Sequence, residues 1–477
     1  MNEQLLRYGA GGDTNLSIIA VIFVLLAGLL ILVFPRNYVV VPLFLTSFFI
    51  PLGQKLVILG LHFTMFRIII LFGWLRVIFG GHSDNGGTSR FRLNSIDKAL
   101  VLYVFSGVVT FTLLWRDSAA IVDRLGFLYN AFGIYFLLRL LYRDEEDVDR
   151  TIRVFAVICA VLAVCMVTEQ FTGRNLFSVF GGVPELTFVR EGKLRSQGPF
   201  AHPILAGTFG ATLLPLFLGL WWQNKKARAA ALLGIVSATV ITITSMSSTP
   251  LMGYFAGILA LCFWPLRRQM RLLRWGVVIC LLGLHMVMKA PVWALIGRVD
   301  LVGGSSGDHR YQLVNQFIGH FGDWWLLGVK EAGKWGFEMS DLSNQFVETG
   351  VTGGLLTLVL FVAIIVYCFK RLGDARAASQ GNPPAERRLW ALGAALFSNV
   401  AAFFGIAYFD QTMVSWYMLV AMIVTATTAG LQSPSAVAST PAYLERTVSA
   451  FSTAAVMPKG SRALRHHGRL GFERSPR

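Results

Sequence analysis

The segment GVTGGLLTLVLFVAIIVYCF (residues 350–369) is twenty residues long and carries no charged side chain. A helix of this length measures about 30 Å, which is the thickness of the hydrocarbon core of a bilayer. In lipid the backbone must satisfy its own hydrogen bonds, so we expect a transmembrane helix here. The whole chain fits this setting, because 55% of its 477 residues are hydrophobic and only 14% are charged. Soluble domains carry about 25% charged residues.

Apolar runs of similar length recur along the sequence and are separated by polar links. They predict an all-α polytopic membrane protein with about 12–13 transmembrane helices in a membrane domain of residues 1–431. The runs are residues 17–34, 38–52, 56–79, 98–114, 120–141, 152–171, 203–222, 228–246, 249–265, 273–289, 350–369, 389–408 and 412–431.

The net charge of +16 is spread over the links rather than gathered in one domain. This distribution fits orientation by the positive-inside rule and contact with anionic lipids, and it argues against nucleic acid as a partner. The tail 432–477 is rich in Ser, Ala and Pro and then basic, so we predict a disordered cytoplasmic segment. The basic links are residues 90–98, 139–153, 225–228, 267–274 and 370–388.

If most basic links are cytoplasmic, two sizeable loops, 172–202 and 290–349, are expected on the external side. The links 225–228 and 267–274 are not expected to be cytoplasmic together unless a run between them is re-entrant or miscounted. The second loop is expected to contain a short amphipathic helix along the membrane interface. Its apolar residues at helical spacing are Tyr311, Val314, Phe317, Ile318 and Phe321.

The stretch RSQGPFAHPILAGTF (residues 195–209) precedes one apolar run and contains groups that a membrane scaffold does not need. Arg195 offers planar, bidentate donors that suit phosphate oxygens. The pairs Gly198-Pro199 and His202-Pro203 predict a fixed turn before a helix whose N-terminus favours an anion.

The second loop repeats this chemistry with Arg298 and Arg310. Two arginine-bearing loops on one side of a membrane predict a clamp for a phosphorylated substrate at the interface, although loop arginines can also simply contact lipid headgroups. His202 and His309 are candidates either for proton acceptors or for hydrogen-bonded turn residues. No metal-ligand cluster is recognisable in the sequence, so no metal site is predicted.

Three segments in this order resemble the O-antigen ligase / O-antigen polymerase superfamily. They are RSQGPFAHPILAGTF, HRYQLVNQFIGHFGDWWLLGVK (309–330) and DLSNQFVETGVTGGLLTLVLF (341–361). In that family an R-x-x-G-x-F-x-(H/N)-P element opens a helix, a long external loop carries an Arg and an amphipathic helix, and G-x-x-G starts the next helix. The third segment reads closer to exopolysaccharide polymerases than to lipid A-core ligases.

The resemblance implies a glycosyltransferase of bacterial surface polysaccharide biosynthesis, embedded in the inner membrane with its active face periplasmic or extracellular. Its donor would be a glycan on a polyprenyl diphosphate and its acceptor another glycan, with no metal or other cofactor. Membrane lipids and other polysaccharide-assembly proteins are further partners in this reading. The matching positions imply that Arg195 and Arg310 bind the diphosphate, and that Gly350 and Gly353 allow a tight turn at the helix entrance.

One position departs from the family pattern. Family ligases carry a His followed by Asn, Ser or Gln, and nine further residues separate this pair from the G-x-x-G element. Counting back from Gly350 puts Ser340 in the second position and Met339 in the His position. Methionine cannot accept a proton, so another group would have to act as the base. Glu348, Asp341 and His309 are the candidates. A transporter or flippase of lipid-linked sugars is the alternative class, although charge concentrated in two loops and the absence of an internal repeat disfavour it.

Overall fold

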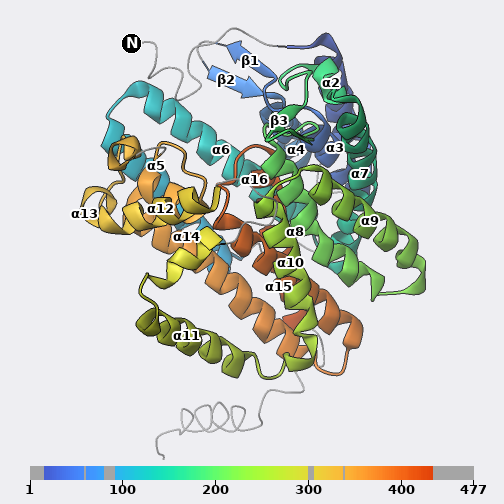
Figure 1. The fold of residues 1–477 in the computed structure, drawn as a ribbon. Helices are drawn as coiled ribbons and strands as arrows, with labels where there is room; N and C mark the ends of the chain where they lie inside the picture. Colours follow the sequence, from blue (N-terminus) through green and yellow to red (C-terminus); the bar gives the residue numbers. More distant parts are fainter. Residues whose placement is uncertain (1–15, 59–60, 80–91, 299–305, 337–338, 433–477) are drawn as a thin grey trace, which may run out of the picture. The chain divides into compact units, whose positions relative to one another are not determined.

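The computed structural model describes residues 16–58, 61–79, 92–298, 306–336 and 339–432. The chain divides into two units, Met1–Ser433 and Pro434–Arg477. The second unit contains almost all of the predicted tail 432–477 and lies outside the described residues. The described residues of the first unit form a helical bundle, as the apolar runs predicted, and also two short β-hairpins that were not predicted (Figure 1).

In the N-terminal part, the described residues form three α-helices, one short 3-10 helix and one hairpin. The run 56–79 was expected to be a single helix, but its first residues form the antiparallel hairpin, in which Lys55 pairs with Thr64. The helix therefore begins only at Met65. The elements are α2 (Ile18–Val33), η1 (Arg36–Tyr38), α3 (Val40–Phe49), β1 (Lys55–Ile58), β2 (Leu61–Thr64) and α4 (Met65–Phe79).

The remaining apolar runs form helices, several of which start at polar caps or at prolines. Asn94 and Asp97 make a capping box at the start of α5, and Asp117 and Asp144 cap α6 and α7. The helices are α5 (Ser95–Trp115), α6 (Ser118–Leu141), α7 (Glu145–Thr172), α8 (Pro203–Trp221), α9 (Arg228–Thr244), α10 (Ser248–Cys262), α11 (Met270–Val287), α14 (Gln345–Ala378), α15 (Pro383–Phe403) and α16 (Gln411–Gln432), with η3 (Lys225–Ala227) and η4 (Trp264–Leu266) in the links.

Eight helices within the described residues are long and apolar enough to cross a membrane, judged by length and composition. Two shorter apolar helices, α2 and α10, accompany them. Helices such as α7 and α9 expose rows of Val, Leu and Ile, a surface suited to lipid. The chain is therefore a multi-pass helical membrane protein, with fewer helices of full spanning length than the 12–13 predicted.

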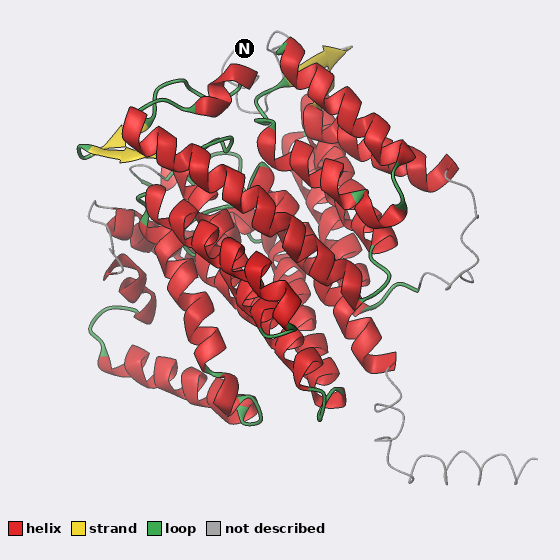
Figure 2. Cartoon of the chain, turned by 90° about the vertical axis from the view of Figure 1, so that its right-hand side faces the viewer, coloured by secondary structure: helices red, strands yellow, loops and turns green. Residues whose placement is uncertain are grey.

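Hydrogen bonds between distant links show which helix ends lie together. Thr249 Oγ1 donates to the carbonyl of Gly405 (3.1 Å), and Gln411 Nε2 donates to the carbonyl of Pro199 (3.0 Å). The start of α10, the α15–α16 link and the residues before α8 therefore meet at one end of the bundle. We call it the site end; both hairpins lie there (yellow in Figure 2).

The opposite end gathers many of the basic links, and we call it the basic end. Gln223 Nε2 donates to the carbonyl of Pro384 (3.2 Å), and Arg267 pairs with Glu386 (3.4 Å). The links 225–228 and 267–274 thus lie at the same end, and the prediction that this would require a re-entrant run was wrong. The two antiparallel helices α9 and α10 return the chain to the end from which it left.

Two longer segments cover the site end. Between α11 and α14, the apolar face of α12 packs on α14, where Leu313 and Phe317 join a buried cluster with Val347 and Val351. The predicted amphipathic helix is therefore present, and its face with Leu313 and Phe317 packs on α14, whereas Ile318 and Phe321 are exposed. Its place along a membrane interface stays a prediction. The elements of the two segments are η2 (Leu176–Phe180), β3 (Phe188–Arg190), β4 (Lys193–Arg195), η5 (Val292–Arg298), α12 (Ser306–Gly319), α13 (Phe321–Trp324) and η6 (Ala332–Trp335).

Candidate functional site

The stretch that begins at Arg195 is held firmly by its neighbours. Gly198 has a left-handed backbone (φ 56°), which supplies the predicted turn. The amides of Gln197 and Gly198 donate to the buried carboxylate of Glu169 on α7, at 3.1 and 2.9 Å. Asn175 donates to the carbonyl of Gly198 (2.7 Å). The loop is therefore a fixed mount for Arg195, with Glu169 as a support that the sequence did not single out.

His202 serves as the N-cap of α8, and Pro203 is the first residue of that helix. The Nδ1 of His202 accepts a hydrogen bond from the amide of Ile204 (3.2 Å). Burial, reinforced by the positive charge of Arg195, lowers the pKa of His202 to about 4. The imidazole is therefore neutral at neutral pH, which fits the turn-residue alternative and not a cationic contact to phosphate.

The link between α9 and α10 is a Ser/Thr-rich turn, TSMSSTP (244–250), that the sequence analysis passed over. Met246 has a left-handed backbone (φ 43°). Ser247 caps α10 by position but makes no side-chain cap hydrogen bond. A helix N-terminus without such a cap favours a negative charge in front of it. We call residues 245–249 the hydroxyl turn.

Arg195 points its guanidinium into the hydroxyl turn. Nη2 donates to Ser247 Oγ in a short hydrogen bond, and Nε donates to the carbonyl of Ser245 (3.4 Å). Arg195 is 5% exposed and forms no ion pair within the described part of the chain. Burial, together with the positive charge of Arg190, lowers the pKa of its guanidinium. A buried cation without an anionic partner is costly.

Arg310, in the first turn of α12, reaches the same turn from the other long segment. Its Nη2 donates to Thr249 Oγ1 at 2.8 Å, and the residue is 5% exposed. Arg195 and Arg310 therefore contact residues two positions apart, although 115 positions separate them in the sequence. The structure brings together the two arginines that the sequence singled out first.

The other predicted binding residues are placed less centrally. The side chain of Arg298, at the end of η5, lies outside the described residues. His309 Nε2 lies 3.1 Å from the carbonyl oxygen of Asp341 and 3.9 Å from its carboxylate. The Asp341 side chain is 72% exposed. An exposed carboxylate beside a His is a modest candidate for a base.

Glu348, the preferred base, faces the other side of α14. It accepts a hydrogen bond from Gln345 Nε2 (3.3 Å), and the charged groups that act on it are Arg124 and Asp123 on α6. Neither arginine of the site is among them. Met339, at the position where family ligases carry a His, is buried in the cluster under α12.

The glycine element at the start of α14 also differs from the prediction. Gly350 and Gly353 are helical, and the left-handed break (φ 73°) falls at Gly354. Gly350 instead allows close packing, because a Cβ there would lie 2.5 Å from the ring of Phe317.

Asp410 is a carboxylate that the sequence analysis missed. It lies in the α15–α16 link with a left-handed backbone (φ 51°), which is unusual for a residue other than Gly. Burial raises the pKa of Asp410 to about 6. Its neighbour Gln411 holds Pro199 of the Arg195 loop, so Asp410 belongs to the same end of the bundle. Its position before an apolar run gave no signal that it is buried.

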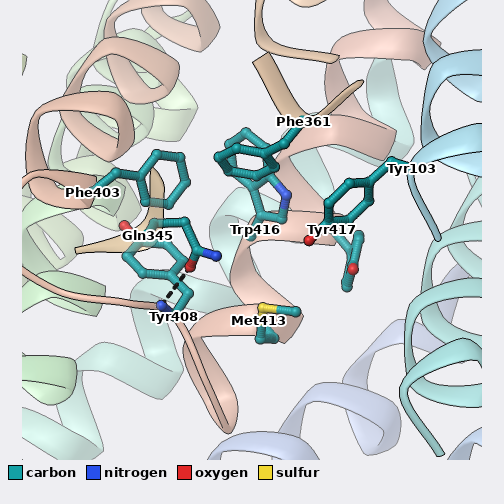
Figure 3. Close-up of a pocket in the computed structure, with 8 residues that line it drawn as sticks. All are labelled: Tyr103, Gln345, Phe361, Phe403, Tyr408, Met413, Trp416 and Tyr417. Carbon is teal, nitrogen blue, oxygen red and sulfur yellow. Dashed lines mark hydrogen bonds between the residues drawn. The ribbon is translucent and has the colours of Figure 1, made fainter. Parts of the chain in front are cut away.

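A small pocket lies beside Gln345, between α5, α14, α15 and α16 (Figure 3). Gln345 Oε1 accepts a hydrogen bond from the amide of Tyr408 (2.6 Å), shown dashed. The lining is largely aromatic and contains neither Arg195 nor Arg310, so the pocket is separate from the hydroxyl turn. It is lined by Tyr103, Gln345, Phe361, Phe403, Tyr408, Met413, Trp416 and Tyr417.

Comparison with protein-family models finds no match to this sequence, and comparison with curated proteins finds none either. The chemistry of the site must therefore be argued from its own residues.

Proposed function

We propose that this protein is a membrane glycosyltransferase that polymerises, or ligates, glycan units carried on a polyprenyl diphosphate during bacterial surface polysaccharide biosynthesis. The observation that carries the proposal is the convergence of two buried guanidinium groups on the hydroxyl turn at the head of α10. The proposal also rests on the resemblance of three segments to the O-antigen ligase / polymerase superfamily.

A diphosphate matches the donors at this site. Arg195 and Arg310 offer forked N–H groups, the hydroxyl turn offers Ser and Thr hydroxyls, and the start of α10 adds a partial positive charge. The two guanidinium groups would bind anionic phosphate oxygens more strongly than the neutral hydroxyl oxygens that they contact in this structure. The surrounding bundle presents apolar helices that suit the isoprenoid chain of the donor.

The same groups can assist the transfer. An acceptor hydroxyl oxygen attacks the anomeric carbon while the bond from this carbon to the diphosphate oxygen breaks. The electron pair goes to the departing polyprenyl diphosphate, whose growing charge the two guanidinium groups stabilise. The hydroxyl proton passes to a base. Among the carboxylates at the site end, Asp410 is half-buried and has no arginine partner within the described residues, whereas Glu348 interacts with Arg124.

The distribution of Lys and Arg between the two ends of the bundle supports a periplasmic or extracellular site. Basic links gather at the basic end, and Lys and Arg mark the cytoplasmic side of membrane proteins. The hydroxyl turn lies at the opposite end. A donor flipped to the outer leaflet would then present its diphosphate at the level of Arg195.

The first test replaces the arginines in a strain that lacks the gene, with surface polysaccharide sized on a gel. Arg195→Ala and Arg310→Ala are each expected to abolish long chains while the protein remains in the membrane. Arg195→Lys is expected to fail as well, because a single ammonium cannot make the bidentate contacts of a guanidinium. Arg190→Ala, an exposed residue of the same hairpin, is the matched control and is expected to retain polymer.

The pattern of products separates the candidate activities. Single repeat units without long chains indicate a polymerase, and long chains accumulating on the lipid carrier indicate a ligase. If the variants instead trap lipid-linked units on the cytoplasmic leaflet, the protein is a transporter. Normal polymer from Arg195→Lys would contradict the clamp. Binding of undecaprenyl diphosphate to the purified protein should weaken roughly tenfold or more in Arg195→Ala, the loss expected for a charged hydrogen bond.

A further inference from the structure

A second group of arginines lies at the basic end, where η4 leads into α11 beside the end of α14. Arg267 and Arg268 directly follow η4, and the positive charge of each repels the positive charge of Arg376 on α14. Among the described residues, Glu386 in the first turn of α15 is the carboxylate whose negative charge attracts Arg376. The group therefore holds three positive charges and one negative charge.

Two of these arginines have no partner of their own in the described part of the chain. Arg376 is half-buried and Arg268 is exposed, and neither forms a hydrogen bond or an ion pair there. Glu386 is already engaged, because it pairs with Arg267 (3.4 Å) and accepts from the amide of Gly381 (3.3 Å). One carboxylate balances only one of the three positive charges, so a further anion between the arginines would stabilise the group.

Two tryptophans lie beside this group, an arrangement typical of headgroup depth. The guanidinium carbon of Arg267 lies 4.2 Å from the ring centre of Trp264, and Trp264 meets Trp390 edge to face at 5.8 Å. Tryptophans are enriched where a membrane meets water. An anion bound here would thus lie at the level of lipid phosphates.

The adjacent helix α11 presents the apolar surface that acyl chains need. None of its residues is buried, and Leu272 and Trp275 in its first turns are 72% and 60% exposed. Figure 1 shows α11 beside the bundle, joined to α10 through the link that carries Arg267 and Arg268. Phosphate-binding charges next to an exposed apolar helix match both parts of a phospholipid.

We propose that Arg267, Arg268 and Arg376 form a binding site for the phosphate of an anionic phospholipid, whose acyl chains lie along α11. Basic pockets between helices on the cytoplasmic side are a known mode of lipid recognition. The site is separate from the hydroxyl turn and does not depend on the glycosyltransferase proposal. Bound lipid would hold α11 against the ends of α14 and α15.

The test measures thermal stability and lipid binding of the full chain in detergent. Phosphatidylglycerol is expected to raise the melting temperature of the wild type, because a ligand that binds the folded state stabilises it, while phosphatidylcholine should not. The double variant R268A/R376Q should bind phosphatidylglycerol roughly tenfold or more weakly by native mass spectrometry. Arg153→Ala, an exposed arginine on α7, is the matched control and should bind like the wild type.

Three outcomes would overturn the proposal. They are equal stabilisation by phosphatidylcholine, undiminished phosphatidylglycerol binding in the double variant, and full stabilisation by inorganic phosphate alone, which would indicate a soluble anion. If R376Q does not fold, Arg268→Ala decides alone, since Arg268 is exposed and its loss leaves the packing intact. In that case, wild-type affinity of Arg268→Ala for phosphatidylglycerol would contradict the site.

Discussion

Two arginines of this protein, Arg388 and Arg195, show that one residue type can have different roles. Arg388 on α15 pairs with the carboxylates of Glu145 and Asp149 on α7, so its charge is balanced within the protein. Within the described residues, the guanidinium of Arg195 contacts the hydroxyl turn and the ring of Phe188 and forms no ion pair. The first arrangement joins two helices, whereas the second leaves a charge available for a ligand. Removing Arg195 should therefore affect binding more than folding.

Asp410 provides a test of the base. Asp410→Asn should lower the single-turnover rate of glycosyl transfer at least about a hundredfold, the usual contribution of a general base. The rate of the wild type should fall as the pH drops below about 6, because the carboxylate is protonated there and cannot accept a proton. Asparagine tolerates the left-handed backbone (φ 51°), so the variant should fold.

The control for this prediction is Glu191→Gln. Glu191 also has a left-handed backbone (φ 53°), but it is exposed at the tip of the hairpin that carries Arg195. Its loss should leave the transfer rate unchanged. Full activity of Asp410→Asn, measured beside unchanged binding of undecaprenyl diphosphate, would remove Asp410 from the mechanism and return attention to Glu348.

Among the elements, α14 is one of those that hold the segment carrying Arg310. Its break at Gly354 brings the backbone against α13, since Leu355 N donates to the carbonyl of Trp325 (2.8 Å). A Cβ at Gly354 would lie 2.5 Å from the carbonyl oxygen of Leu326. The segment α12–α13, which carries Arg310, is thus fastened to α14 at a point where only Gly fits.

Gly354→Ala should lower the melting temperature and loosen the α12–α13 segment. The left-handed backbone alone should cost about 1–3 kcal/mol, and the clash with Leu326 adds to it. Limited proteolysis should then cut within residues 306–336 earlier than in the wild type. Gly373→Ala in the same helix, where a Cβ meets nothing within 4 Å, is expected to be neutral or slightly stabilising. Equal melting temperatures for the two variants would contradict this account of the break.

The elements also show what a single sequence can predict. Each apolar run contains a helix. The length of an apolar run is a local property that can be read directly from the sequence. The break at Gly354, the hairpin at 55–64 and the hydroxyl turn were missed, since each depends on a contact with a distant segment. Arg195 and Arg310 were named from their chemistry, but nothing in the sequence showed that Ser247 and Thr249 would be their shared contact.

On the scale of the whole bundle, the two ends differ in their content of Lys and Arg. The basic end carries the links with most Lys and Arg, including the proposed lipid site, and the site end carries the hydroxyl turn. The positive-inside rule therefore predicts that the site end lies outside. Both proposals depend on this orientation, because the donor would be reached from the outer leaflet and the anionic phospholipid from the inner one.

Cysteine labelling in intact cells tests the orientation directly. In a variant whose five cysteines are replaced, Lys193→Cys at the site end and Lys226→Cys at the basic end each introduce one exposed thiol. A membrane-impermeant maleimide should label Lys193→Cys in intact cells and Lys226→Cys only after permeabilisation. The cysteine-free protein controls for background. The reverse pattern would place Arg195 and Arg310 in the cytoplasm, where transfer from an outward-facing lipid-linked donor could not occur.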